Sequence, residues 1–166
     1  MLKINLTLCR LILSSLFLIG FCNALAYSDT SHTSTTDKPF FDTFSGNLST
    51  NIKRTKNENK LGLFLFFSTP NCPFCHRMKT TLFKQTNVQT YYPLNFSLLD
   101  INIESDKHLI DEQGQRLKQI SYAELHRIRL MPTSIFLNQQ GQPIYRHVGM
   151  IVDRQEFTWL GEYLLS

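Results

Sequence analysis

Hydrophobic residues along the chain gather into short runs that predict strands. Residues 61–67, LGLFLFF, form a continuous apolar run followed by the turn sequence STPN, which is typical of a strand buried on both faces. Residues 94–102 contain enough apolar positions to predict a second strand. Two further runs, 134–138 and 143–148, flank the polar sequence QQGQ and predict a β-hairpin. The first strand is therefore expected at the centre of the core.

Helices are predicted before, between and after these strands. Residues 44–57 and 73–86 are predicted to be helical, whereas residues 103–120 are mostly polar and predict a loop or an insertion. Ser121 and Glu124 form a capping box, which predicts a short helix that ends near residue 129.

A last helix is predicted near the C-terminus. Asp153 and Glu156 cap its start, and Phe157, Leu160 and Leu164 follow at helical spacing. The order is helix, strand, helix, strand, helix, strand, strand, helix. This order indicates an α/β fold in which a mixed central β-sheet is flanked by helices on both faces.

The N-terminal segment has the pattern of a secretory signal peptide. Lys3 and Arg10 make its beginning basic, an apolar run follows at 11–21, and Ala24-Leu25-Ala26 supplies small residues for cleavage. We expect residues 1–26 to be removed after Ala26, so that the mature protein is secreted into the periplasm. An uncleaved membrane anchor is the less favoured alternative, because the apolar run is shorter than the roughly 20 residues that span a bilayer.

Length and composition fit one folded domain. The chain has 166 residues, of which 42% are hydrophobic, which is enough for one core but not for two. Residues 27–39 are mainly Ser, Thr, Asp and His and predict a disordered leader, so the domain is expected at 40–166. Cleavage removes two of 17 basic residues and none of 13 acidic ones, which leaves a net charge of +2. Such a small charge argues against binding to nucleic acid or strongly to a membrane surface.

Cleavage also changes which cysteines remain. Cys9 and Cys22 belong to the signal peptide, and lipid attachment at Cys22 is disfavoured because bulky Phe21 stands where a small residue is needed. The mature chain keeps only Cys72 and Cys75. In an oxidising compartment, such a close pair is expected to form a disulfide for at least part of the time.

The sequence Asn71-Cys72-Pro73-Phe74-Cys75 joins the buried strand to the following helix. Cys72 is expected at the N-terminus of that helix, where unpaired N–H groups and the helix dipole favour the thiolate. Cys75 lies one turn further along the same face, within reach of a disulfide. Pro73 fits the first turn, where its missing N–H has no partner to lose. We therefore predict that exposed Cys72 attacks a substrate disulfide and that shielded Cys75 resolves the mixed disulfide.

Three other roles are open for the cysteine pair. A purely structural disulfide across three residues would restrict little chain entropy. Half a zinc site would need two more ligands, and His76, His126 and His147 do not form a second pair at ligand spacing. The sequence CPFCH also matches the attachment signature of c-type haem, but a strand enters the motif directly and no axial ligand is evident downstream. We expect neither a metal nor a cofactor.

A second motif, Leu130-Met131-Pro132-Thr133, stands directly before the predicted strand at 134–138. Proline belongs at the start or the edge of a strand. With both motifs in place, the chain from about residue 62 to its C-terminus resembles the thioredoxin superfamily. More narrowly, it resembles periplasmic thioredoxin-related proteins of the SoxW type, which are associated with sulfur oxidation. The matching stretches are FSTPNCPFC, LMPTSIF and an ending that contains Gly141, Gly149 and FTWLGEY.

The resemblance implies a thioredoxin fold and a role for each motif residue. It implies that Pro132 follows a cis peptide bond and packs against the disulfide, an ordinary trans proline being the alternative. It also implies that the Met131 backbone contacts a substrate strand and that Gly149 leaves room for it. One position departs from the family. Thioredoxins keep a buried acid six residues before the first cysteine, where this chain has Phe66, so proton transfer would use water or another group.

The expected function is that of an extracytoplasmic thiol–disulfide oxidoreductase with Pro73 and Phe74 inside its active-site motif. Neither a dimerisation domain nor a large helical insertion is evident, which favours a monomeric reductase over an isomerase or an oxidase. Its expected partners are proteins with disulfide bonds and an electron donor of the membrane or periplasm. A thioredoxin-fold binding protein with incidental cysteines is the non-enzymatic alternative.

Overall fold

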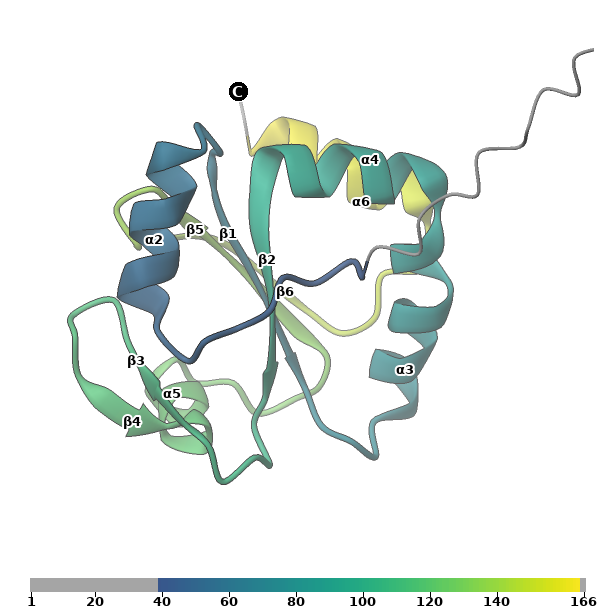
Figure 1. Cartoon of the computed structure of the whole chain (residues 1–166). Helices are drawn as coiled ribbons and strands as arrows, with labels where there is room; N and C mark the ends of the chain where they lie inside the picture. Colours follow the sequence, from purple (N-terminus) through teal and green to yellow (C-terminus); the bar gives the residue numbers. More distant parts are fainter. Residues whose placement is uncertain (1–38, 165–166) are drawn as a thin grey trace, which may run out of the picture. The chain divides into compact units, whose positions relative to one another are not determined.

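A four-stranded β-sheet forms the centre of residues 39–164, the part of the chain that this computed structural model describes (Figure 1). Its strands are β1 (Gly62–Ser68), β2 (Phe96–Asn102), β5 (Thr133–Asn138) and β6 (Pro143–Val148), in the spatial order β2-β1-β5-β6. β2 is parallel to β1, whereas β5 is antiparallel to β1 and β6 is antiparallel to β5. The predicted mixed sheet is confirmed. The predicted signal peptide, 1–26, and all of the predicted leader except Pro39 lie outside the described residues.

Helices cover both faces of the sheet, as expected (Figure 1). α2 (Leu48–Asn57) and α5 (Gln119–Leu125) pack on one side, which we call the α2 face. α3 (Pro73–Thr80), α4 (Thr86–Asn95) and α6 (Arg154–Tyr163) pack on the other side, which we call the disulfide face because both cysteines lie in its core. Between residues 39 and 164, none of the helices combines the length and the apolar character needed to cross a membrane.

β1 is buried along its whole length, as its unbroken apolar run predicts. Successive side chains of a strand point to opposite faces, so this one strand supplies both cores. Its contribution to the α2 face is Leu63, Leu65 and Phe67, and its contribution to the disulfide face is Phe64 and Phe66. The strand that leads to the cysteine motif is therefore held firmly on both sides.

The helix predicted at 73–86 is wrong in its extent. α3 ends at Thr80, a 3-10 turn (η1, Leu82–Lys84) follows, and α4 begins at Thr86 and continues to Asn95. The hydroxyls of Thr80 and Thr81 donate to the carbonyls of His76 and Arg77 in the preceding turn, which competes with the regular helical pattern. As a result, the start predicted for the second strand is also wrong, because residue 94 is the exposed Leu94 of α4.

The polar stretch 103–120 is an insertion with structure of its own. It contains the hairpin of β3 (His108–Ile110) and β4 (Arg116–Lys118) and the first turn of α5. Leu109 anchors the hairpin in the core of the α2 face, and the carboxylate of Asp111 closes its turn by accepting from two backbone N–H groups. The predicted capping box is wrong, because α5 begins at Gln119 after Lys118, which makes no capping hydrogen bond.

The C-terminal elements agree with the sequence pattern. β5 and β6 form the predicted hairpin. The carboxylate of Asp153 accepts hydrogen bonds from the backbone N–H groups of Gln155 and Glu156, so it caps α6 as expected. Phe157 of this helix is fully buried in the core of the disulfide face.

Candidate functional site

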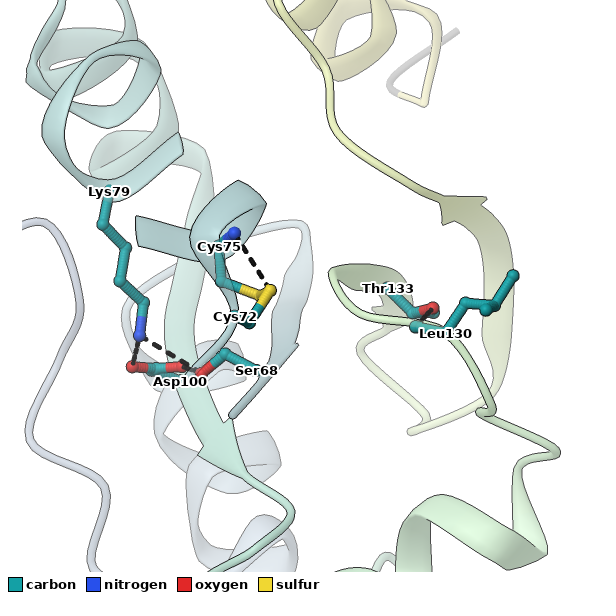
Figure 2. Close-up of a disulfide and its surroundings, with 7 residues drawn as sticks. All are labelled: Ser68, Cys72, Cys75, Lys79, Asp100, Leu130 and Thr133. Atoms are coloured by element: carbon teal, nitrogen blue, oxygen red, sulfur yellow. Dashed lines mark hydrogen bonds and ion pairs between the residues drawn. A yellow bond between two sulfur atoms is a disulfide. The ribbon is translucent and has the colours of Figure 1, made fainter. Parts of the chain in front are cut away.

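The cysteine motif lies where β1 passes into α3 (Figure 2). Cys72 is the N-cap residue of α3 and Pro73 occupies its first turn, as the sequence predicts. Cys72 and Cys75 form a disulfide with an S–S distance of 2.04 Å and a Cα–Cα distance of 5.3 Å. The backbone N–H of Cys75 also points at the Cys72 Sγ, at a donor–acceptor distance of 3.1 Å. This N–H belongs to the unpaired donors at a helix start, which favour negative charge on the sulfur when the disulfide opens.

The two sulfur-bearing side chains differ in exposure. Cys72 is 9% exposed and Cys75 is 1% exposed. Cys72 is less accessible than the sequence suggested, but the difference between the two cysteines has the expected direction. Phe74, between them, points outward and is among the exposed large hydrophobic side chains. A partner that approaches this site therefore reaches Cys72 before Cys75.

Strand register brings the second motif to the same end of the sheet. Thr133, the first residue of β5, pairs with Phe67 near the end of β1 and with Val148 at the end of β6. Met131 packs against the buried cluster that contains both cysteines. Pro132 is buried and follows a cis peptide bond, which confirms the cis bond expected from the resemblance. The expected packing of Pro132 against the disulfide stays a prediction.

Gly149 completes this end of the sheet. Its backbone N–H donates to the Pro132 carbonyl over 2.8 Å, and its φ of +102° is a conformation that favours glycine. A Cβ placed there would meet no heavy atom within 4 Å. The space beside Gly149 is therefore open. The roles of Met131, Pro132 and Gly149 in substrate binding remain predictions.

The sequence analysis missed a polar cluster beside the motif, which we call the Lys79 cluster: Ser68, Lys79 and Asp100 (Figure 2). Lys79 Nζ lies 2.5 Å from Asp100 Oδ2 and 3.2 Å from Ser68 Oγ. Ser68 Oγ donates to Asp100 Oδ1 over 2.7 Å. The signal in the sequence was the spacing of four residues between Cys75 and Lys79, which places both on one helix face. The position of Asp100 could not be read in this way, because it depends on the pairing of β2 with β1.

Two of the three alternative roles of the cysteine pair, a metal site and haem attachment, can be compared with this geometry. Within residues 39–164, no three His, Cys, Asp or Glu side chains gather in a way that could hold a metal ion. His76 is exposed on α3. Covalent haem attachment would need both sulfur atoms for thioether bonds, and here they are bonded to each other.

Comparison with known proteins identifies the architecture. Residues 48–165 match the family model described as a thioredoxin-like domain. A thioredoxin-fold protein from Helicobacter pylori is 20% identical with a TM-score of 0.58, over 64% of this chain and 70% of that one. A putative disulphide-isomerase from Bacteroides thetaiotaomicron is 27% identical with a TM-score of 0.54, over 70% and 89%. The oxidoreductase DsbH is 15% identical with a TM-score of 0.55, over 69% and 78%. A search of curated proteins gives no match.

The family match and the geometry agree with each other. The matched residues include all four strands of the central sheet, the strand-to-helix junction with the disulfide, and the cis proline directly before β5. The chain belongs to the thioredoxin-like domain family and has a thioredoxin fold.

Proposed function

We propose that this protein is an extracytoplasmic thiol–disulfide oxidoreductase that reduces disulfide bonds in other proteins. The observation that carries the proposal is the Cys72–Cys75 disulfide at the start of α3, with Met131 packed against the same cluster. The solved structures that resemble this chain include an oxidoreductase and a putative disulphide-isomerase. These features support exchange chemistry at the pair.

The reaction begins from the reduced pair. The Cys72 thiolate attacks one sulfur of a substrate disulfide, the substrate S–S bond breaks, and the departing substrate thiolate takes up a proton. Cys75 then loses its proton, and its thiolate attacks the Cys72 Sγ. The Cys72–Cys75 bond forms, the mixed disulfide breaks, and the second substrate thiolate takes up a proton. Two electrons pass from the protein to the substrate, and a dithiol donor of the membrane or periplasm returns them.

The end of the sheet beside the disulfide offers a place for an extended substrate segment. No hydrogen bond joins the backbone of Met131 to another residue within 39–164, so its N–H and C=O are available to pair with an added strand. The open space at Gly149 lies on the adjoining segment, one hydrogen bond from Pro132. In this proposal the substrate strand runs along Met131 and past Gly149, which brings its disulfide to Cys72.

The proposal has a direct test in the reduction of a disulfide-bonded reporter protein with a dithiol as electron source. The wild-type protein should accelerate reduction. Cys72→Ser should abolish the acceleration, and Cys75→Ser should stop at a mixed disulfide through Cys72 that is visible on a non-reducing gel. Equal activity of wild-type protein and Cys72→Ser would contradict the proposal and favour a binding protein with incidental cysteines.

The location and subfamily are part of the same proposal. Export to the periplasm after cleavage behind Ala26 rests on the signal-like pattern of residues 1–26. The resemblance to SoxW-type proteins rests on the matching stretches around Cys72 and Pro132. The mass of the protein recovered from the periplasm of a producing bacterium tests the first point. A mature chain that begins at Tyr27 is expected, and a full-length chain held in the cytoplasm would contradict export.

A further inference from the structure

The Lys79 cluster lies on the face of α3 that carries Cys75. Lys79 follows Cys75 by four residues on this helix, which makes the two side chains neighbours on one face, about 5–6 Å apart between their Cβ atoms. Asp100 reaches the cluster from β2 and Ser68 from the end of β1. Three elements therefore hold the ammonium group of a residue that stands one helical turn after the more deeply buried cysteine.

The surroundings of this ammonium group are aromatic. Lys79 Nζ lies 5.6 Å from the centre of the Phe66 ring and 6.0 Å from that of the Phe41 ring. Phe66 belongs to the same buried cluster as Cys75, and Phe41 packs against that cluster. Because these apolar rings exclude part of the water around a side chain that is 34% exposed, a charge on Lys79 acts on the Cys75 sulfur with less screening than it would at a fully open surface.

We infer that Lys79 is a positioning residue for thiol exchange, which stabilises the thiolate of Cys75 through its charge, and that Asp100 limits the strength of this effect. The inference rests on the proposed function. It concerns the step in which Cys75 gives up its proton and its thiolate displaces the substrate sulfur from Cys72. Lys79 favours the thiolate, and Asp100 with Ser68 holds the ammonium in place and offsets part of its charge.

Other charges around α3 do not provide this effect. His76 and Arg77 of the same helix and Lys84 of η1 are exposed. β1 contributes only the uncharged Ser68 to the cluster, and the segment before β5 brings Met131 and Pro132, which carry no charge. Lys79 stands on α3 one turn after Cys75, and Asp100 of β2 is its ion-pair partner.

Two variants that remove opposite charges separate this role from simple anchoring. Lys79→Met keeps a long apolar side chain between the aromatic rings, leaves Asp100 unbalanced, and should raise the pKa of the Cys75 thiol. Asp100→Asn keeps the shape, leaves Lys79 unbalanced, and should lower it. Alkylation of Cys75 in the reduced protein, followed by mass spectrometry over a pH series, measures both. At neutral pH, we expect alkylation to slow by about three- to tenfold in Lys79→Met and to accelerate by about the same factor in Asp100→Asn.

A matched control is available at another ion pair of the domain, Arg54–Asp42. Asp42→Asn removes a similarly exposed carboxylate from Arg54, which lies on the α2 face, and should leave the alkylation profile of Cys75 unchanged. Lys79→Arg keeps the charge and should restore the wild-type profile. Thermal unfolding of each variant confirms that it is folded.

The outcomes separate the inference from the proposed function. Shifts of opposite sign in Lys79→Met and Asp100→Asn support the inference, and they are measured without any substrate. Shifts of the same sign, or no shift in folded variants, would overturn it even where the reduction assay succeeds. Failure of the reduction assay with the opposite shifts intact would overturn the proposed function and leave the charge effect on Cys75 standing.

Discussion

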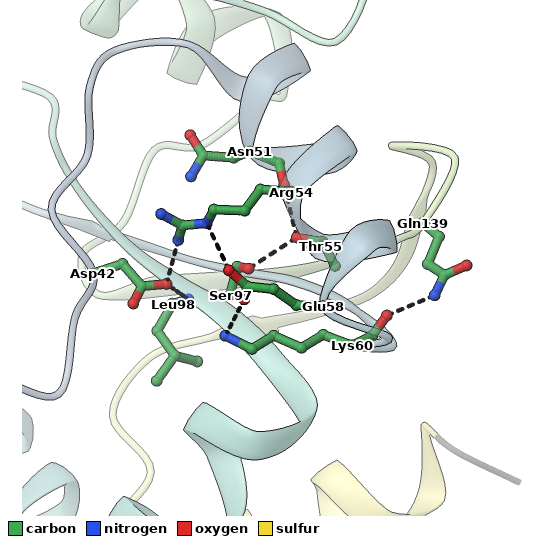
Figure 3. Close-up of polar contacts among 9 residues, drawn as sticks. All are labelled: Asp42, Asn51, Arg54, Thr55, Glu58, Lys60, Ser97, Leu98 and Gln139. Carbon is green, nitrogen blue, oxygen red and sulfur yellow. Dashed lines mark hydrogen bonds and ion pairs between the residues drawn. The ribbon is translucent and has the colours of Figure 1, made fainter.

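Two ion pairs, one that joins α3 to β2 and one that joins α2 to the segment before it, are alike in chemistry but differ in what they contact. In the Lys79–Asp100 pair the side chains are 34% and 30% exposed. In the Arg54–Asp42 pair, whose two residues are drawn in Figure 3, they are 41% and 28% exposed. Asp42 also accepts from the backbone N–H of Leu98, so it covers the free edge of β2. Asp100 instead joins Ser68 next to the cysteine motif. The two pairs are therefore similar in charge and in exposure, and what distinguishes Lys79–Asp100 is its place beside the cysteine motif.

The two faces of the sheet also differ in how they are packed. The core of the α2 face is mainly Leu and Ile, whereas that of the disulfide face is rich in aromatic rings. Tyr92 and Phe157 stack with a centroid distance of 4.0 Å, and the Tyr92 hydroxyl donates to the Phe157 carbonyl over 2.6 Å. Burial raises the pKa of Tyr92 far above its usual value, so it remains a neutral donor. The stacked rings of Tyr92 and Phe157 thus join α4 to α6 in the same buried cluster that contains the cysteines.

The largest expected effect compares two adjacent core residues of β1. Phe64→Ala removes a fully buried ring that contacts several others, including Phe136 at a centroid distance of 4.9 Å. It should lower the free energy of unfolding by about 3–5 kcal/mol. Leu65→Ala, on the α2 face, should lower it by about 2–5 kcal/mol. Urea unfolding measures both. A loss well below about 3 kcal/mol for Phe64→Ala would contradict the role of its ring as a packed member of the aromatic core.

A smaller effect is expected at the edge of β2. Asp42→Ala removes the acceptor of the Leu98 N–H and the partner of Arg54, and should lower the free energy of unfolding by about 1 kcal/mol. Glu58→Gln is the matched variant, because Glu58 pairs with Arg54 and Lys60 at the surface. It should change stability by less than about 0.5 kcal/mol. If Asp42→Ala altered the rate of disulfide reduction, the Arg54–Asp42 pair would also influence the cysteine site, and its contrast with the Lys79–Asp100 pair would be wrong.

The smallest expected effect is a change in stability with pH, caused by His126 on the α2 face. Burial lowers the pKa of His126, which Glu112 partly offsets and Arg146 reinforces. The folded state therefore disfavours the protonated ring, which the unfolded chain accepts at its ordinary pKa. The contribution of His126 to stability is present above that ordinary value, about 6.5, and declines as the pH falls below it towards the lowered value.

The measurement is urea unfolding of wild-type protein and His126→Gln across this range of pH. The free energy of unfolding of the wild-type protein should fall on acidification, and that of the variant should fall less. The His126 ring packs at a tilt against the Tyr122 ring in the α2 face, so the alkylation rates of the cysteines should not change. Parallel pH profiles for the two proteins would contradict the assignment.

Local signals in the sequence predicted much of the fold and of the candidate site. The apolar run of β1, the turn in the β5–β6 hairpin and the capping carboxylate of Asp153 each act over a few residues, and each was read correctly. The cysteine pair and the cis proline came from motifs. The break after α3 was missed because it depends on how threonine hydroxyls compete for helix carbonyls.

The remaining features depend on contacts between distant residues. The β3–β4 hairpin has strands of three residues each, too short for a hydrophobic pattern, and it is held by the burial of Leu109. The Lys79 cluster joins residues that are 11 and 21 positions apart in sequence. Its assembly requires Asp100 to lie opposite Phe66 in the parallel register of β1 and β2, which the sequence alone does not reveal.

The reduction potential of the Cys72–Cys75 pair tests the central claim most directly. The protein would be equilibrated with dithiol buffers of known potential, and the fraction of oxidised pair would be read by alkylation and mass. We predict one reversible two-electron transition at a potential below about −180 mV, in the range of disulfide reductants. A pair that does not titrate reversibly, or that titrates near about −120 mV as a strong oxidant does, would contradict a working reductase site at Cys72 and Cys75.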